Sequence, residues 1–133
     1  MERKTALITG ATSGIGEACA RRFANGGYNI IITGRTADKL QTLKAELETE
    51  GVSVLALAFD VCDRNATREA VNSIPESFKP IDVLINNAGL ARGLEPEYEG
   101  SFQDWDEMID TNIKGLLNMT RLVVPQMVSL NHG

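Results

Sequence analysis

The chain has 133 residues, 43% of them hydrophobic, which is enough for one folded domain with a core of its own. Thirteen basic and 18 acidic residues give a net charge of -5 without any basic run, which argues against nucleic acid or an anionic membrane as a partner. Because two cysteines make no metal-ligand spacing and no apolar run approaches the roughly 20 residues of a membrane span, we expect a cytoplasmic protein without a metal site.

The first predicted strand is the uncharged run Ala6–Ile8, which stops at Gly10. An apolar run without alternation is typical of a strand covered on both faces, as in a parallel sheet. Gly14 and Gly16 then open a helical pattern over residues 14–25. Glycine lets a ligand approach the backbone closely, and a helix N-terminus presents free N–H groups to an anion. The stretch predicts a cradle for a nucleotide phosphate, with a tight strand-to-helix turn as the alternative.

Strands and helices alternate along the rest of the chain. Further strands are predicted at residues 29–33, 53–59 and 83–85. Helices are predicted to begin after the capping residues Thr36, Asp63 and Ser101. This alternation predicts an α/β fold: the amino-terminal half of a Rossmann-type, doubly wound parallel sheet, with about four strands and four helices.

Two helices carry apolar stripes that we expect to face the core. In the helix of residues 14–25 the stripe consists of Ile15, Ala18, Cys19, Arg22 and Phe23. In the long helix after Ser101 it consists of Trp105, Met108, Ile109, Ile113, Leu116, Leu117, Val123, Val124 and Met127. Asn112 lies within the second stripe, and a buried amide needs hydrogen-bond partners. A structural hydrogen bond to a neighbouring strand is one interpretation of this residue, and a functional role is the other.

The second strand is followed by Arg35 and Thr36, with no carboxylate before Asp38. An NAD site commonly has an acidic residue here that binds the ribose hydroxyls. A guanidinium instead suits a 2′-phosphate, which it can bind through paired charge-assisted hydrogen bonds. The pattern therefore favours NADP as the cofactor, with Arg35 as a solvated loop charge in the alternative interpretation.

Polar residues also follow the third and fourth strands, at the sheet edge where open α/β sheets bind ligands. Asp60 could accept a hydrogen bond from an adenine amino group while Val61 packs against the ring, or Asp60 could cap the following turn. After the fourth strand come Asn86, Asn87, Ala88 and Gly89. We interpret Asn86 as structural and Asn87 as nearer the cofactor, with Gly89 permitting close approach.

These residues together resemble one family. Thr9 to Gly16 is similar to the T-G-x-x-x-G-I-G motif of the short-chain dehydrogenase/reductase family, and Asn86 to Gly89 to its N-N-A-G motif. Asn112 falls where the family keeps a helix asparagine, and residues 95–116 look closer still to NADP-dependent 3-hydroxy acid (serine and allo-threonine) dehydrogenases. The resemblance implies hydride transfer between NADP and a small hydroxy acid, in an enzyme that forms dimers or tetramers.

The resemblance also implies roles for individual residues. Asn112 would be the asparagine of the family's catalytic tetrad, which holds a water in the proton relay. The cofactor-binding residues would be Gly10, Ala11, Thr12, Ser13, Gly14, Ile15, Gly16, Arg35, Thr36, Asp60, Val61, Asn87, Ala88 and Gly89.

One departure from the family is large: the catalytic serine and the Tyr-x-x-x-Lys pair are not found. Tyr28 and Tyr98 are followed four positions later by Ile32 and Phe102. We therefore expect residues 1–133 to be an NADP-binding Rossmann domain that is incomplete at its carboxyl end and inactive alone. A truncated, inactive dinucleotide-binding module is the alternative. In such a half-domain the fourth strand would be a bare edge, and Leu116 and Val123 would be exposed.

Overall fold

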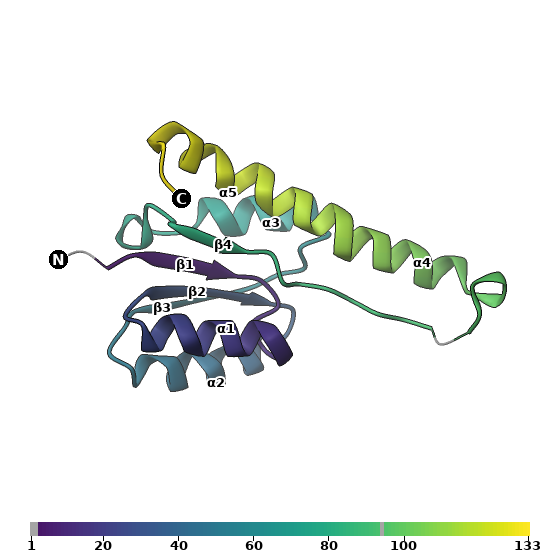
Figure 1. The fold of residues 1–133 in the computed structure, drawn as a ribbon, viewed down its shortest axis with the longest axis horizontal. Coiled ribbons are helices and arrows are strands. Elements are labelled where there is room, and N and C mark those ends of the chain that lie inside the picture. The colour runs from purple at the N-terminus through teal and green to yellow at the C-terminus, as the bar shows by residue number, and fades with distance from the viewer. Residues whose placement is uncertain (1–2, 94) are drawn as a thin grey trace.

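The computed structural model describes residues 3–93 and 95–133 and contains one parallel sheet (Figure 1). Its strands lie in the order β3-β2-β1-β4 and comprise β1 (Thr5–Ile8), β2 (Asn29–Gly34), β3 (Val54–Ala58) and β4 (Val83–Ile85). The helices are α1 (Gly14–Asn25), α2 (Ala37–Glu48), α3 (Arg64–Asn72), α4 (Phe102–Ile109) and α5 (Leu116–Leu130). A π-helical turn, Asp110–Gly115, joins α4 to α5. This architecture confirms the predicted Rossmann-type half.

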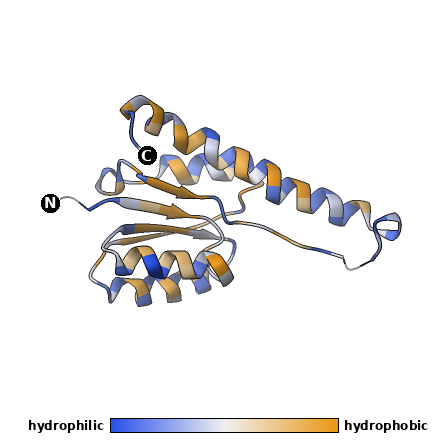
Figure 2. Ribbon diagram, viewed as in Figure 1, coloured by the Kyte–Doolittle hydropathy of each residue, from blue (hydrophilic) through white to orange (hydrophobic). Residues whose placement is uncertain are grey.

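Helices cover both faces of the sheet, α1 and α2 on one face and α3 and α5 on the other (Figure 1). Side chains of β2 alternate between the two cores: Ile30 and Ile32 pack toward α1 and α2, whereas Ile31 packs toward α5. All three are fully buried, which explains why the strand sequence shows no polar alternation. In Figure 2 β4 is coloured as hydrophobic, whereas the covering helices mix hydrophobic and hydrophilic residues. The double covering therefore accounts for the sequence pattern.

The buried stripe of α1 differs from the predicted one. Ile15 is 74% exposed, and Ala18 and Arg22 are exposed as well. The face that packs on the sheet is formed by three small residues spaced four apart, namely Gly16, Ala20 and Ala24. Cys19 and Phe23 are partly buried beside them. The prediction was confirmed for Cys19 and Phe23 but wrong for Ile15, Ala18 and Arg22, because small residues let the helix backbone approach the sheet closely.

The long helix buries only part of the predicted stripe: Val123 is buried, and Met127 packs against the second core. Its buried residues are Gly115, Asn118, Met119 and Val123, whereas Ile109, Ile113, Leu116 and Leu117 are between 43% and 57% exposed. A π-helical turn holds more residues than an α-helical turn, so a stripe drawn at 3.6 residues per turn loses its register there. The expected exposure of Leu116 is thus observed, but that of Val123 is wrong, since Val123 is 3% exposed and packs in the second core.

Two of the three predicted helix caps form side-chain hydrogen bonds. The Asp63 side chain accepts from the Ala66 N–H at 3.0 Å, and Ser101 accepts from the Asp104 N–H at 3.4 Å. Thr36 occupies the N-cap position of α2, but its side chain makes no capping bond. The first turn of α2 is therefore left without a side-chain cap.

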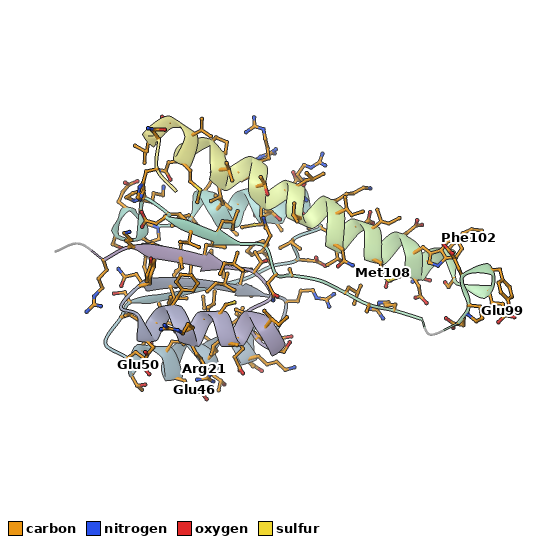
Figure 3. The ribbon with its side chains drawn as sticks, viewed as in Figure 1. Arg21, Glu46, Glu50, Glu99, Phe102 and Met108 are labelled. Atoms are coloured by element: carbon orange, nitrogen blue, oxygen red, sulfur yellow. The ribbon has the colours of Figure 1, made fainter. Side chains whose placement is uncertain are left out.

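Separate ion pairs join α1 to α2 on one side of the sheet and connect α4 to the segment after β4. Arg21 on α1 pairs with Glu46 on α2 and joins these helices beneath the sheet (Figure 3). α4 projects beyond the sheet and carries Phe102 at its outer end, with Glu99 in the turn before it (Figure 3). The Arg92 Nε lies 2.6 Å from a Glu107 carboxylate oxygen, which ties the segment after β4 to α4.

Within the residues that the structure describes, none of the helices has the length and hydropathy needed to cross a bilayer.

Candidate functional site

The connections leaving the sheet diverge between β1 and β4. After β1 the chain proceeds to β2 and β3 on one side, and β4 then pairs with the other side of β1. In open α/β sheets such a point leaves a crevice at the carboxyl ends of the strands, where ligands bind. A cavity of about 280 Å³ lies at this edge of the sheet. The topology therefore places a candidate site where the sequence predicted one.

Ten of the fourteen predicted cofactor-binding residues line this cavity. They are Gly10, Thr12, Ser13, Arg35, Thr36, Asp60, Val61, Asn87, Ala88 and Gly89. Five lining residues were not predicted: Thr33, Gly34, Lys39, Phe59 and Thr111. Among these, Lys39 carried a sequence signal, because it stands three residues after the N-cap Thr36, where a capping box has Glu or Gln.

The other four predicted residues lie around the cavity without lining it. The buried Ala11 donates its N–H to the Thr33 carbonyl at 3.1 Å, which fixes the turn after β1 against β2. Gly14 and Ile15 are exposed at the start of α1, and Gly16 is buried beneath the turn. Their proposed contacts with a cofactor would be made through the backbone at the start of the helix.

The Thr9 hydroxyl joins the turn after β1 to the turn after β4. Its oxygen accepts the N–H groups of Asn87 at 3.0 Å and Ala88 at 2.9 Å. The Asn87 side chain completes the link, since its Nδ2 donates to the Gly10 carbonyl at 3.0 Å. These three hydrogen bonds fix the two walls of the cavity relative to each other.

Two glycines make this arrangement sterically feasible. Gly10 has a φ of +61°, and a Cβ there would lie 2.9 Å from the Ala88 Cα. A Cβ on Gly16 would overlap the Gly10 carbonyl oxygen and the Asn87 side-chain nitrogen. Backbone approaches this close leave no space for a side chain. The packing of the turn therefore requires glycine at both positions, in addition to any requirement of a ligand.

The start of α1 suits an anion. Its N-cap residue Ser13 is extended, and the side chain accepts no hydrogen bond from the first turn. The first N–H groups of a helix have no intrahelical partner, and they carry the positive end of the helix dipole. In addition, the Oγ1 atom of Thr33 is buried and has no partner among the described residues. Unfilled donors and an orphaned hydroxyl beside an open cavity fit a polar, phosphate-bearing ligand.

The cavity wall at the end of β2 is cationic. Arg35 and Lys39 both line it, and Asp60 is the one carboxylate among the described lining residues.

Asp60 Oδ1 accepts the Cys62 N–H at 3.1 Å and the Cys62 thiol at 3.0 Å, so the turn-capping interpretation of Asp60 is observed. Desolvation, the hydrogen bond to Asp60 and that residue's charge raise the pKa of the Cys62 thiol to about 11. Cys62 is therefore a protonated donor, not a nucleophile, near neutral pH.

Asn118 holds the Asp60–Val61 turn from the long helix. It is 7% exposed, its Nδ2 donates to the Val61 carbonyl at 2.9 Å, and its Oδ1 accepts from Arg64 Nε at 3.2 Å. The buried Thr67 hydroxyl lies 3.3 Å from the same carbonyl, and its shortest hydrogen bond goes to the Asp63 carbonyl at 2.8 Å. Asn118 was not predicted, although it has the same sequence signal as Asn112: an amide on an apolar helix face.

Asn112 is exposed, contrary to the buried position expected from the stripe. Its Oδ1 accepts the Leu90 N–H at 2.7 Å, and its Nδ2 donates to the Leu90 carbonyl at 2.9 Å. The amide thus makes structural hydrogen bonds, but to the loop after β4 and not to a strand as the structural interpretation expected. Its neighbour Thr111 is the residue of this turn that lines the cavity. Asn86 donates to the Thr120 hydroxyl at 3.1 Å and links β4 to α5.

Comparison with known proteins identifies the family. Residues 4–133 match the family model described as short chain dehydrogenase. The chain belongs to this family. Curated proteins with similar sequences include an NADP-dependent 3-hydroxy acid dehydrogenase of Salmonella typhi, 53% identical over 96% of this chain and 50% of its own length. A serine 3-dehydrogenase of Agrobacterium fabrum is 48% identical over 93% of this chain and 49% of its own length.

A solved structure of similar sequence agrees in fold. The closed form of a serine dehydrogenase complexed with NADP⁺ matches with a TM-score of 0.91 and 48% identity, over 97% of this chain and 51% of that chain. The chain spans about half the length of the curated relatives it matches. Both the family and the resemblance to hydroxy acid dehydrogenases predicted from the motifs are thereby confirmed.

We predict that replacing Thr9 with valine lowers the free energy of unfolding by about 2 kcal/mol, because it leaves the Asn87 and Ala88 N–H groups without their acceptor. Urea denaturation of the purified protein measures this. Thr42→Val is the matched control, since the Thr42 hydroxyl donates to the Asp38 carbonyl on an exposed helix face and its loss should cost at most about 0.5 kcal/mol. Equal losses in the two variants would contradict the structural role of Thr9.

Proposed function

We propose that residues 1–133 form the NADP-binding Rossmann domain of a short-chain dehydrogenase that acts on a small hydroxy acid, such as a 3-hydroxy acid or serine. The reaction would transfer a hydride between the nicotinamide and the carbinol or carbonyl carbon of the substrate, with the cofactor supplying the redox chemistry. The observation that carries the cofactor choice is Arg35, which lines the cavity beyond β2 at a place without a carboxylate. The named activities of the relatives support the substrate class.

The described residues would bind and orient the cofactor. The open first turn of α1 would hold its phosphates, with Ser13 as an additional hydroxyl donor. Asp60 and Val61 would contact the adenine, and Arg35 and Thr36 the 2′-phosphate. Asn87, Ala88 and Gly89 would border the part of the cofactor nearest β4. By resemblance, Asn112 would take part in the proton relay.

A truncated, inactive dinucleotide-binding module is the second candidate. It is favoured by one sequence observation: the 133 residues contain no tyrosine followed four residues later by lysine. Two structural observations favour an enzyme with further covering elements. β4 has a strand neighbour on one side only in the described sheet, and Ile109, Ile113, Leu116 and Leu117 present apolar surface. The homo-oligomer, either a dimer or a tetramer, is inferred from the family resemblance and not from this surface.

We predict that a purified protein of these 133 residues gives no measurable NADPH formation from serine, allo-threonine or other 3-hydroxy acids, because the sequence lacks the family's Tyr-x-x-x-Lys pair. Its NADP binding, followed by calorimetry in the same samples, should nevertheless be detectable. NADPH absorbance measures turnover. Turnover by the 133-residue protein would show that its catalytic groups lie elsewhere than proposed.

The intact mass of the protein made by its native host separates the two candidates. A mass well above 14.4 kDa together with NADP-dependent oxidation of a hydroxy acid would support the enzyme. A mass of 14.4 kDa with NADP binding alone would support the inactive module.

A further inference from the structure

The cationic wall of the cavity contains a second residue whose position is hard to explain by the fold alone. We propose that Lys39 binds the 2′-phosphate of the cofactor together with Arg35, and so helps to set the preference for NADP over NAD. This inference rests on the proposed function, since it assigns one more residue to the same site.

Lys39 is unfavourably placed for helix stability. It is the third residue of α2, in the first turn, where the positive end of the helix dipole disfavours a cation. A glutamate here could complete a capping box with Thr36, yet the residue is lysine and the Thr36 side chain caps nothing. A cation at such a position raises the local positive potential, which a bound anion would offset.

Arg35 and Lys39 line the same cavity. Neither pairs with a carboxylate among the described residues, whereas Arg21, Arg92 and Lys114 all do. Lys39 also lines the adjoining groove between α1 and α2, whose acidic residues are Glu17, Asp38 and Glu46. None of these carboxylates lines the cavity, and none forms an ion pair with Lys39 in the described chain. The two cations are therefore available to a ligand in the cavity.

The hydroxyl groups near the two cations also favour a polar ligand at this wall. Thr33, which lines the same cavity, is 1% exposed, and its Oγ1 has no partner in the described chain. A buried hydroxyl without a partner is unusual in a folded protein and indicates an unmet polar contact. The Thr36 hydroxyl, free of any capping bond, is a further donor at this wall.

Charge balance explains why two cations would be needed. A phosphate monoester carries about -1.5 to -2 charges near pH 7. Arg35 alone supplies one positive charge, so a second cation is required to match the phosphate. NAD has a hydroxyl at this position and would gain little from Lys39. The residue would therefore discriminate between the two cofactors without affecting the rest of the dinucleotide.

The test compares binding of 2′,5′-ADP and 5′-AMP, which differ in the 2′-phosphate alone, by calorimetry on the purified protein. We expect Lys39→Ala to weaken 2′,5′-ADP about fivefold to tenfold, the scale of a partly exposed charge-assisted contact, and to leave 5′-AMP unchanged. Lys39→Arg should retain most of the affinity. Lys44→Ala on the same helix is the matched control, because Lys44 does not line the cavity, and it should leave both affinities unchanged. Circular dichroism melting verifies that each variant is folded.

The outcomes separate this inference from the proposed function. If the unmodified protein binds 2′,5′-ADP more tightly than 5′-AMP but Lys39→Ala changes neither affinity, the inference is overturned and the proposed cofactor stands. An equal loss for both ligands would also overturn it, since it would indicate a general disturbance of the site. If the unmodified protein does not prefer 2′,5′-ADP, the proposed cofactor and the role of Lys39 both fail.

Discussion

Replacing Gly16 with alanine is expected to lower the free energy of unfolding by about 3 kcal/mol or more, because the added methyl group would overlap two groups that cannot move away easily. One is the Gly10 carbonyl oxygen and the other the Asn87 side-chain nitrogen that donates to it. The substitution would push α1 away from the sheet and open the link between the first and last strands. Thermal and urea denaturation, with NADP binding as a second readout, measure the loss.

Gly14→Ala is the control that distinguishes packing from backbone conformation. Gly14 has a φ of +56°, and a Cβ there would meet no atom within 4 Å. Alanine at this position should therefore cost about 1 kcal/mol, the strain of the left-handed conformation alone. If both variants lose the same stability, the close approach at Gly16 is not the reason for its glycine.

Reversing the charge of Arg35 should have the largest effect on ligand binding. We expect Arg35→Asp to weaken NADP by about 2 kcal/mol, or roughly thirtyfold, through loss of a charge-assisted contact and repulsion of the 2′-phosphate. Binding of NAD should not fall, because a carboxylate at this place can accept hydrogen bonds from ribose hydroxyls. Calorimetric titration of both cofactors into the purified variant measures the change in preference.

Arg68→Asp serves as the matched control. Arg68 is an exposed arginine on α3 and does not line the cavity, so the substitution makes the same change in net charge away from the site. It should change NADP affinity little. If Arg35→Asp also leaves NADP affinity nearly unchanged, Arg35 is a solvated loop charge, as the alternative interpretation held.

Local sequence signals predicted the elements of the fold well. β4 was expected at residues 83–85 and α1 at 14–25, and both have these bounds. Such segments are bounded by glycines and asparagines, whose backbone preferences act locally, and their apolar runs report burial on both faces. The positions of Arg35 and Asn87 in the cavity lining could be predicted equally well, because residues that follow parallel strands meet at one edge of the sheet.

The side-chain environment was harder to predict, because it depends on contacts distant in the sequence. Nothing local to Ile15 indicates that the glycine beside it, and not the isoleucine, lies against the sheet. The π-helical turn displaced the predicted face of the long helix, so Asn112 was expected to be buried and Asn118 was overlooked. Lys39 was missed although its signal is local, because a lysine in the first turn after the predicted N-cap Thr36 stands only four residues from Arg35.

The hydrogen bonds that Asn87 and Ala88 donate to Thr9 and Gly10 connect residues 77 to 79 positions apart. Contacts this distant in sequence close a long loop, whose entropic cost must be met before they can form. β1, β2 and the intervening α1 can associate through shorter loops, so the cavity would acquire its second wall late in folding. A cofactor that bridges the walls would bind chains whose β4 has docked and would stabilise them by mass action. Ligand concentration would then influence how much of the newly made protein reaches its folded state.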